Sequence, residues 1–211
     1  MTPLPQPAPV ALVVCGALAA DVRRILAERG WQADLYGVPA TYHMRPASIV
    51  AAVDEHLERI RHRYKKVIVA YGDCGTAGEL DRVLERHRAE RPAGEHCYEI
   101  FCGCRFPQLA GQRPTTYFLT DFLVRNWEEV VVREMGLGNA PSLKARLFAG
   151  FTSVTLLRQS ADPDLLEKAE GIAAYLGLPL EVEDVGTGEL ESQLERLMGD
   201  ELPGSGIQVE K

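Results

Sequence analysis

The sequence predicts an α/β protein with a mainly parallel, Rossmann-like sheet flanked by helices. Short apolar runs rich in β-branched residues, such as residues 10–14 and 67–70, are typical of strands buried on both faces. Each run precedes a segment with apolar residues at helical spacing, and this repeated order favours a parallel sheet. Because the order recurs in both halves of the chain, two similar lobes are one possible arrangement. The dinucleotide fingerprint G-x-G-x-x-G is absent.

The first half of the chain is expected to contain three strand–helix units. Gly30 closes the first helix, and Pro46 begins the second, since proline is well tolerated at the first helical position. Strands are predicted at residues 10–14, 33–38 and 67–70. The helices that follow them are predicted at residues 21–29, from 46 onward and at 79–88.

The second half is expected to continue the same order less regularly. The middle of residues 95–104 fits either a fourth strand or the first turn of a helix that begins at Cys97, because the run is too short for its period to decide. Strands are predicted at residues 115–119, 153–157 and 180–185, and helices at 120–135, 143–150, 164–176 and 189–198. The predicted organisation is a flexible lead over residues 1–9, one α/β unit over 10–199 with possible lobes at about 10–110 and 111–199, and a frayed tail over 200–211.

Composition narrows the classes of function. The 211 residues carry a formal net charge of −7, which argues against non-specific binding to nucleic acid or to an anionic membrane. No run approaches the ~20 apolar residues that a transmembrane helix needs. The first ten residues lack the basic region of a signal peptide, and the five cysteines are an odd number. We therefore expect a cytoplasmic protein whose cysteines are free thiols, ligands or nucleophiles.

Thiol and imidazole side chains follow several of the predicted strands. Cys15, His43 and Cys74 lie at three strand exits, and a fourth segment brings His96 and Cys97. The carboxyl ends of neighbouring parallel strands lie roughly 5 Å apart, so these side chains can converge. Thiolate and imidazole together suit zinc, and three thiolates also suit a [4Fe–4S] cluster. The alternative is a set of buried structural thiols, since free cysteine is among the most buried residue types.

Residues around these exits are candidates for supporting roles. Gly72 and Gly75 let the backbone approach a bound cofactor closely. Asp73, Glu99 and Tyr117 are candidate catalytic groups. Each of the three also has a structural interpretation: Asp73 as a turn or N-cap residue, Glu99 as a solvated or capping carboxylate, and Tyr117 as part of the core.

The motifs Y-G-D-C-G-T, H-C-Y-E-I-F-C-G and T-Y-F-L-T-D-F-L-V-R-N-W resemble a bacterial and archaeal family known as domain of unknown function 1638. The resemblance spans roughly residues 10–197 and implies the ligand set Cys15, His43, Cys74 and Cys97. Many relatives carry His-Asp-Cys where this chain has Glu95-His96-Cys97, which favours Cys97 over His96 as a ligand. Cys102 and Cys104 match no family position. The family tends to accompany corrinoid-dependent methyltransferase systems, which implies a corrinoid protein or a methyltransferase as a partner.

These observations lead to a hypothesis and two alternatives. The hypothesis is an enzyme in which thiolate-bound zinc activates a small-molecule substrate, possibly a thiol, for methyl or one-carbon transfer. The first alternative is a [4Fe–4S] protein with one iron open to substrate, as in a lyase, a desulfurase or an electron carrier. The second is a non-catalytic accessory partner of a methyltransferase that handles metal or corrinoid.

Overall fold

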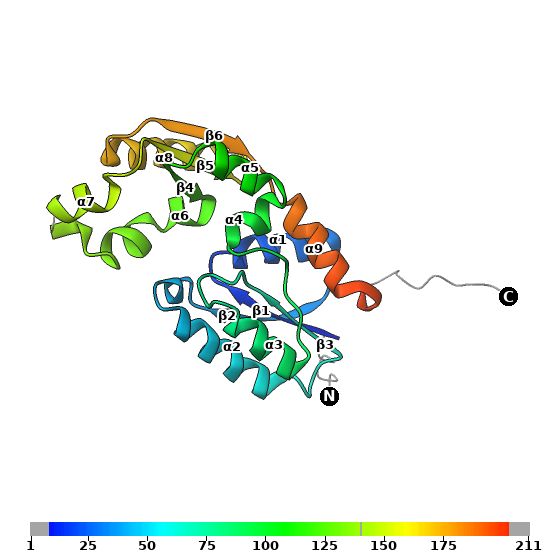
Figure 1. Cartoon of the computed structure of the whole chain (residues 1–211). Helices are drawn as coiled ribbons and strands as arrows, with labels where there is room; N and C mark the ends of the chain where they lie inside the picture. Colours follow the sequence, from blue (N-terminus) through cyan, green and yellow to red (C-terminus); the bar gives the residue numbers. More distant parts are fainter. Residues whose placement is uncertain (1–8, 140, 203–211) are drawn as a thin grey trace, which may run out of the picture. The chain divides into compact units, whose positions relative to one another are not determined.

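A computed structural model describes residues 9–139 and 141–202 (Figure 1). The chain divides into two compact units: unit 1 comprises residues 1–100 and 190–211, and unit 2 comprises residues 101–189. Each unit has its own three-stranded parallel sheet with helices packed on it, which confirms the predicted α/β class. Most of the expected lead and tail, residues 1–8 and 203–211, lies outside the described residues.

The sheet of unit 1 has the strand order β2-β1-β3. Its central strand, β1 (Val10–Cys15), is buried along its whole length and pairs in parallel with β2 (Ala33–Val38) and β3 (Lys66–Ala70). A continuous apolar run is what a strand needs when helices cover both faces of its sheet. The helices of this part of unit 1 are α1 (Ala19–Arg29), α2 (Pro46–Ile60) and α3 (Glu79–His87), together with the 3₁₀ helix η1 (Ala40–Met44).

The end of the chain returns to unit 1. From residue 190 onward α9 (Gly188–Met198) belongs to this unit, and its buried side chains include Leu190, Leu194 and Met198. Arg29 at the end of α1 forms an ion pair with Glu191. Lys65 is 3.4 Å from Glu201 in η4 (Gly199–Glu201). The described residues from 190 onward therefore belong to the same compact unit as β1, β2 and β3.

The sheet of unit 2 has the order β4-β5-β6, from β4 (Thr116–Thr120), β5 (Ser153–Arg158) and β6 (Leu180–Asp184). Its core joins apolar side chains of the strands to those of the helices, including Leu119, Trp127, Leu156 and Ile172. The helices of unit 2 are α5 (Arg105–Gln112), α6 (Asp121–Arg125), η2 (Glu128–Arg133), η3 (Leu137–Asn139), α7 (Pro141–Phe148) and α8 (Pro163–Leu176). Helix α4 (Cys97–Cys102) spans the boundary between the units, and it decides the open assignment of that segment in favour of a helix.

The helix predicted over residues 120–135 is interrupted. The α-helix ends at Arg125, and Glu128–Arg133 forms a π-helix. The side-chain amide of Asn126 donates to the carbonyl of Phe122 at 2.8 Å, and the amide of Glu134 donates to the carbonyl of Glu129, five residues back. The run Val130-Val131-Val132 favours regular helix only weakly, because β-branched side chains lose rotamer freedom there.

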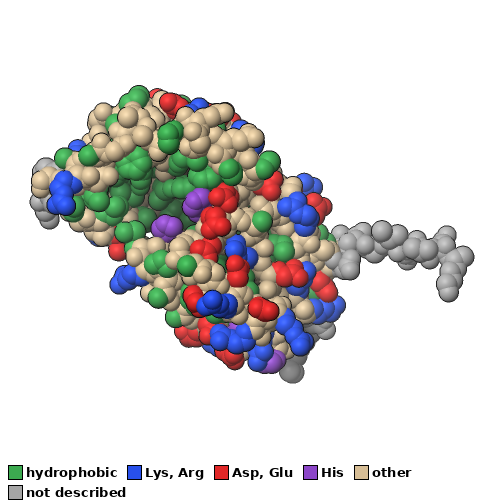
Figure 2. Space-filling view, in the orientation of Figure 1, with side chains coloured by type: hydrophobic (Ala, Val, Ile, Leu, Met, Phe, Trp, Pro, Cys, Tyr) green, Lys and Arg blue, Asp and Glu red, His purple; other side chains and the backbone are tan. Residues whose placement is uncertain are grey.

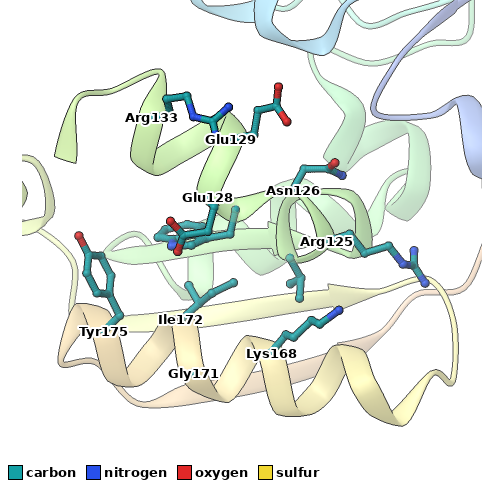
Figure 3. Close-up of a pocket in the computed structure, with 11 residues that line it drawn as sticks. Arg125, Asn126, Glu128, Glu129, Arg133, Lys168, Gly171, Ile172 and Tyr175 are labelled. Atoms are coloured by element: carbon teal, nitrogen blue, oxygen red, sulfur yellow. The ribbon is translucent and has the colours of Figure 1, made fainter. Parts of the chain in front are cut away.

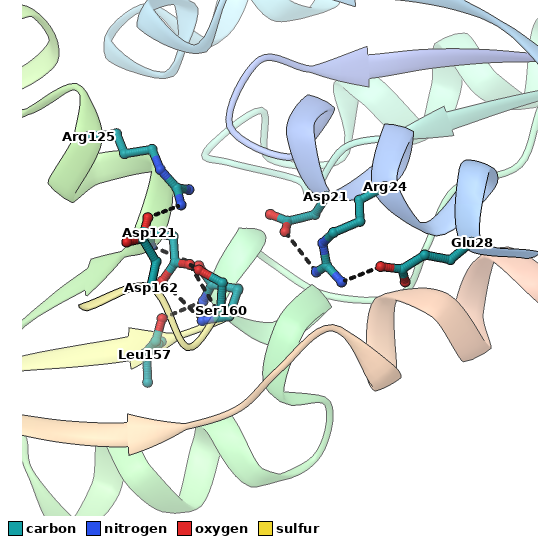
Figure 4. Close-up of polar contacts among 9 residues, drawn as sticks. Asp21, Arg24, Glu28, Asp121, Arg125, Leu157, Ser160 and Asp162 are labelled. Carbon is teal, nitrogen blue, oxygen red and sulfur yellow. Dashed lines mark hydrogen bonds and ion pairs between the residues drawn. The ribbon is translucent and has the colours of Figure 1, made fainter. Parts of the chain in front are cut away.

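Charged side chains of both signs are mixed over α2 and α3 (Figure 2). The ion pairs there include Arg86 with Asp54 at 2.6 Å and Arg59 with Glu55 at 3.8 Å. On α1, Arg24 bridges Asp21 and Glu28 at 3.3 and 3.4 Å (Figure 4). Among the residues that the structure describes, no helix has the length and apolar character needed to cross a membrane.

The carboxyl ends of β4 and β5 are joined through the buried carboxylate of Asp121 (Figure 4). Its oxygens accept hydrogen bonds from the amide of Gln159 at 3.0 Å, and from the amide and hydroxyl of Ser160 at 2.9 and 2.6 Å. In return the side chain of Gln159 accepts from the amide of Asp121 at 2.8 Å. A buried carboxylate with three donors stabilises the turn after β5, because its removal leaves those donors without a partner.

We predict that Asp121→Ala destabilises unit 2 by roughly 3 kcal/mol, because it leaves three donors at a buried site unsatisfied. Urea denaturation followed by circular dichroism measures the loss. Glu170→Ala changes an exposed residue of α8 and serves as the control, with an expected change of less than about 0.5 kcal/mol. Equal stabilities of the two variants would show that the Asp121 contacts do not stabilise the unit.

Candidate functional site

Three cysteines lie at the carboxyl edge of the sheet of unit 1, although in the described part of the chain their sulfur atoms do not form a group within 4.8 Å of one another. Cys15 is the last residue of β1, Cys74 follows β3, and Cys97 begins α4. Burial raises the pKa of Cys74 to about 12, and the charge of Cys15 adds to this effect. Burial is also the largest cause of the raised pKa of Cys97, and the charges of Cys15 and Cys74 raise it further. The three thiols therefore lie within electrostatic range of one another.

Gly72 explains how the segment of Cys97 reaches the end of β3. A Cβ atom at Gly72 would lie 2.8 Å from the Cα of His96 and 3.0 Å from its amide nitrogen, distances that no side chain tolerates. The amide of Cys74 donates to the carbonyl of Glu95 at 2.6 Å, and the amide of Asp73 donates to that of Gly94 at 3.3 Å. Gly72 therefore allows a close contact with the backbone of His96 in the same chain, and this contact sets Cys97 beside Cys74.

The loop after β3 holds Cys74 in an uncommon backbone conformation. Cys74 has a φ of 50°, in the left-handed region, and Gly75 follows with a φ of 82°. A left-handed non-glycine residue costs on the order of 1–3 kcal/mol, and such residues cluster at functional sites. A Cβ at Gly75 would only touch Pro46 Cγ at 3.4 Å, so the positive φ is the reason for this glycine.

Tyr71 brings a polar atom into the thiol cluster. Its side chain is 1% exposed, and its hydroxyl lies beside the Cys15 thiol without a nitrogen or oxygen partner in the described residues. Burial raises the pKa of this phenol, and the nearby Cys15 raises it further. Burial likewise raises the pKa of Cys15. The sequence interpretation did not include Tyr71, although its place just after β3 is the available signal.

The two histidines of the site lie near each other. His43 is in η1, and its pKa is lowered by burial first and by the charge of His96 second. The Nδ1 of His96 is 3.6 Å from Glu99 Oε1, and its ring centroid is 5.5 Å from that of Tyr98. A lowered pKa keeps His43 neutral at pH 7, so one of its ring nitrogens can accept a hydrogen bond or bind a metal.

Asp73 and Glu99 are engaged by the backbone around them. The Asp73 carboxylate accepts from the hydroxyl of Thr76 at 2.6 Å and from the amides of Ala77 and Gly78 at 3.1 and 2.9 Å. Burial acts to raise the pKa of Asp73, but these hydrogen bonds outweigh it and lower the pKa. Glu99 accepts from the amide of Glu95 at 2.8 Å. Both carboxylates therefore hold the loops that carry Cys74 and Cys97.

The remaining predicted residues belong to unit 2. Tyr117 in β4 packs edge-on against Trp127, Phe148 and Phe151, with centroid separations of 6.2, 5.2 and 5.4 Å. Burial raises its pKa. Cys102 is buried, with its pKa raised to about 11 chiefly by burial, and Cys104 is exposed. Tyr117 thus forms part of an aromatic cluster in the core of unit 2.

A group that the sequence interpretation missed is Asp54, Glu58 and His87, between α2 and α3. Their ligand atoms all lie within 4.8 Å of one another. His87 is buried, with its Nε2 2.6 Å from Asp54 Oδ1 and 3.7 Å from Glu58 Oε1. Arg86 also contacts Asp54 at 2.6 Å, so this carboxylate already has two partners. The i, i+4 spacing of Asp54 and Glu58 was visible in the sequence, but only the packing of α2 on α3 brings His87 to them.

Comparison with known protein families matches residues 38–194, about three quarters of the chain, to a family described as "Protein of unknown function (DUF1638)". The matched stretch contains His43, Cys74 and Cys97, and Cys15 precedes it. No curated protein matches the chain.

We predict that Asp73→Ala destabilises unit 1 by roughly 1–2 kcal/mol at neutral pH, because it removes the acceptor for the Thr76 hydroxyl and for the amides of Ala77 and Gly78 just before α3. Because the pKa of Asp73 is lowered in the folded protein, its contribution to the free energy of unfolding is fully present above pH 3.8, the ordinary pKa. That contribution is lost as the pH falls through the pKa of the folded state. The difference between wild type and variant should therefore shrink between about pH 5 and pH 2. Urea denaturation at several pH values measures it, with Asp164→Ala as the control. A difference independent of pH would contradict this assignment.

We predict that the metal-free protein reacts with iodoacetamide first at the exposed Cys104. The raised pKa values keep Cys15, Cys74 and Cys97 protonated near pH 8, so they should react at least about tenfold more slowly. Peptide mass spectrometry measures the rate at each cysteine. Cys104→Ser should remove the fast phase. A fast phase at Cys74 would contradict the burial of that thiol.

Proposed function

Because the chain belongs to the DUF1638 family, described only as a protein of unknown function, we propose a function from its own residues: unit 1 holds a metal centre on Cys15, Cys74 and Cys97. The observation that carries this proposal is that three separate segments bring Cys15, Cys74 and Cys97 to one sheet edge. The charge of Cys15 raises the pKa of Cys74, and the charges of Cys15 and Cys74 raise the pKa of Cys97. A cation between them would reverse that effect, since it favours the thiolate form.

The donor set is suited to a thiophilic metal. Zinc binds thiolate and imidazole, so three cysteines with His43 as the fourth ligand complete a tetrahedral set. Sulfur ligands of one zinc lie under about 4 Å apart. Among the described residues, the group with all ligand atoms within 4.8 Å is the one around His87, so the cysteine side chains have to rotate inward when they bind. A [4Fe–4S] cluster, which is larger, would also take three cysteines and leave one iron open.

The residues around the thiols would support such a centre. The unpartnered hydroxyl of Tyr71 can donate to the sulfur of Cys15 once that sulfur is a thiolate. Asp73 and Glu99 fix the two loops that carry Cys74 and Cys97, and we assign them a positioning role. Cys15 and Cys74 are buried, which limits the access of water to their sulfurs.

The proposed activity is transfer of a methyl or related one-carbon group to a small-molecule thiol. Zinc, when bound, would supply the charge that lowers the pKa of the substrate thiol. The neutral imidazole of His43 would accept the proton of that thiol if it is not itself a ligand. The resemblance to proteins that accompany corrinoid-dependent methyltransferases supports this reaction class. It equally supports an accessory protein that holds the metal without turnover.

We predict that Cys74→Ser lowers the metal content of anaerobically purified protein at least about fivefold, because a hydroxyl is a harder and far less acidic ligand than a thiol. Elemental analysis measures the content, and the visible spectrum distinguishes a brown cluster from colourless zinc. Cys104→Ser, at an exposed thiol outside the site, should leave the content unchanged.

Equal metal content in wild type and Cys74→Ser would contradict the metal centre and favour buried structural thiols. If metal is retained by the wild type, incubation with a methyl donor and a thiol tests turnover. Metal without turnover, together with co-purification of a corrinoid protein, would favour the accessory role.

A further inference from the structure

Unit 2 contains a groove of about 500 Å³ that the proposed metal centre does not use (Figure 3). One wall is α8, through Lys168, Gly171, Ile172 and Tyr175, and the other is formed by residues 124–129 and 133. This volume lies within the range of about 300–1,000 Å³ that is usual for small-molecule sites. Trp127 and Ile172 belong to the core of the unit and give the groove an apolar floor.

Glu128 and the pair Lys168 and Arg125 lie at opposite ends of the groove. In Figure 3 the carboxylate of Glu128 lies toward the Tyr175 end, whereas Lys168 and Arg125 lie toward the other end. Within the described part of the chain, neither Glu128 nor Lys168 has an ion-pair partner, whereas Arg125 contacts Asp162 at 3.2 Å. Lys168 and Tyr175 are seven residues apart on α8, which places them about 10 Å apart along the helix axis.

The Tyr175 end has the character of a cation site. The rings of Tyr175 and Trp127 meet edge to face at 6.4 Å, next to the carboxylate of Glu128. One face of Tyr175 already holds a cation, since Lys144 Nζ lies 4.2 Å from the ring centroid. Aromatic rings attract cations through the negative potential of their faces, and an adjacent carboxylate adds to that attraction. Because Lys144 already covers one face of Tyr175 and would repel a second cation there, an ammonium group of a ligand at this end would bind the carboxylate of Glu128 beside the ring of Trp127.

Gly171 leaves the backbone of α8 open to the groove. It lies inside α8, where glycine costs about 1 kcal/mol relative to alanine. A Cβ atom at this position would meet nothing within 4 Å, so packing within the chain does not require a glycine. The open space above Gly171 is the groove itself. A bound molecule lying against the helix backbone at this point gives the glycine a physical reason.

The opposite wall contains the π-helix η2. Glu128 is its first residue and Arg133 its last. A π-helical turn is rare and is found frequently at functional sites, because it redirects side chains that an α-helix would place elsewhere. Glu129 and Arg133 carry opposite charges four residues apart on this wall, so their effects on a ligand largely cancel.

We propose that this groove binds a small ω-amino acid, a zwitterion whose ammonium and carboxylate groups are separated by several carbon atoms. The carboxylate binds Lys168, the ammonium binds Glu128 beside the rings of Trp127 and Tyr175, and the carbon chain lies over Gly171 and Ile172. The separation of the two charged ends excludes an α-amino acid, whose ammonium and carboxylate share one carbon. It also distinguishes the ligand from a simple acid or amine, which would leave one of the two ends without a partner.

Isothermal titration of the full chain with a set of probes tests this inference. We expect 6-aminohexanoate to bind at least tenfold more tightly than glycine, hexanoate or hexylamine. Glu128→Gln should lower the affinity for 6-aminohexanoate at least fivefold and leave the affinity for hexanoate unchanged. Lys168→Gln should lower the affinity for 6-aminohexanoate and leave the affinity for hexylamine unchanged. No binding of 6-aminohexanoate at millimolar concentration, or equal affinity for the four probes, overturns the proposal.

Gly171→Leu separates binding from folding. Leucine favours helix more than glycine does, so the variant should unfold at an equal or higher urea concentration while losing 6-aminohexanoate binding at least tenfold. Gly111→Leu is the matched control, an exposed glycine of α5 whose Cβ would also meet nothing within 4 Å. The control should keep the affinity of wild type. Undiminished binding by a folded Gly171→Leu variant would also overturn the proposal.

Discussion

The candidate site of unit 1 depends on the close contact between Gly72 and the backbone of His96. Any side chain at Gly72 would collide with that backbone, and the hydrogen bond from Cys74 to Glu95 requires the same approach. Because of this contact, a segment more than twenty residues downstream lies against the end of β3. Without it, Cys97 would begin its helix elsewhere, and the sheet edge would hold two thiols instead of three.

Parallel topology supplies the rest of the arrangement. β1 is central in the sheet, so its last residue, Cys15, is next to the exits of both neighbouring strands. Burial keeps the thiols protonated when no cation is present, and the charge of Cys15 adds to this effect at Cys74 and Cys97. The same two effects couple any metal binding to proton release, because each sulfur ligand must lose its proton. The buried Tyr71 hydroxyl beside Cys15 and the left-handed Cys74 are further features that a simple structural core does not need.

Unit 2 uses the same kind of sheet differently. At the ends of β4 and β5 it has Asp121, whose carboxylate is fully engaged by Gln159 and Ser160. This edge is therefore held by internal hydrogen bonds. The open feature of unit 2 is the groove beside α8, where Glu128 and Lys168 lack ion-pair partners within the described residues and Gly171 leaves space. The similarity of two parallel sheets thus does not extend to the chemistry of their residues.

The sequence by itself determined the α/β class, because unbroken apolar runs such as Val10–Val14 have the composition of strands buried on both faces. It also placed Cys15 and Cys74 at one edge, since the exits of parallel strands share an edge, whereas Cys97 lies there because of the contact between Gly72 and His96. Only the tertiary structure decided that residues 97–102 are helical, that α9 returns to the first sheet, and that Tyr71 stands beside Cys15. The same is true of His87 against Asp54 and of the groove at Gly171. These features depend on contacts between segments far apart in the chain, and local periodicity contains no information about such contacts.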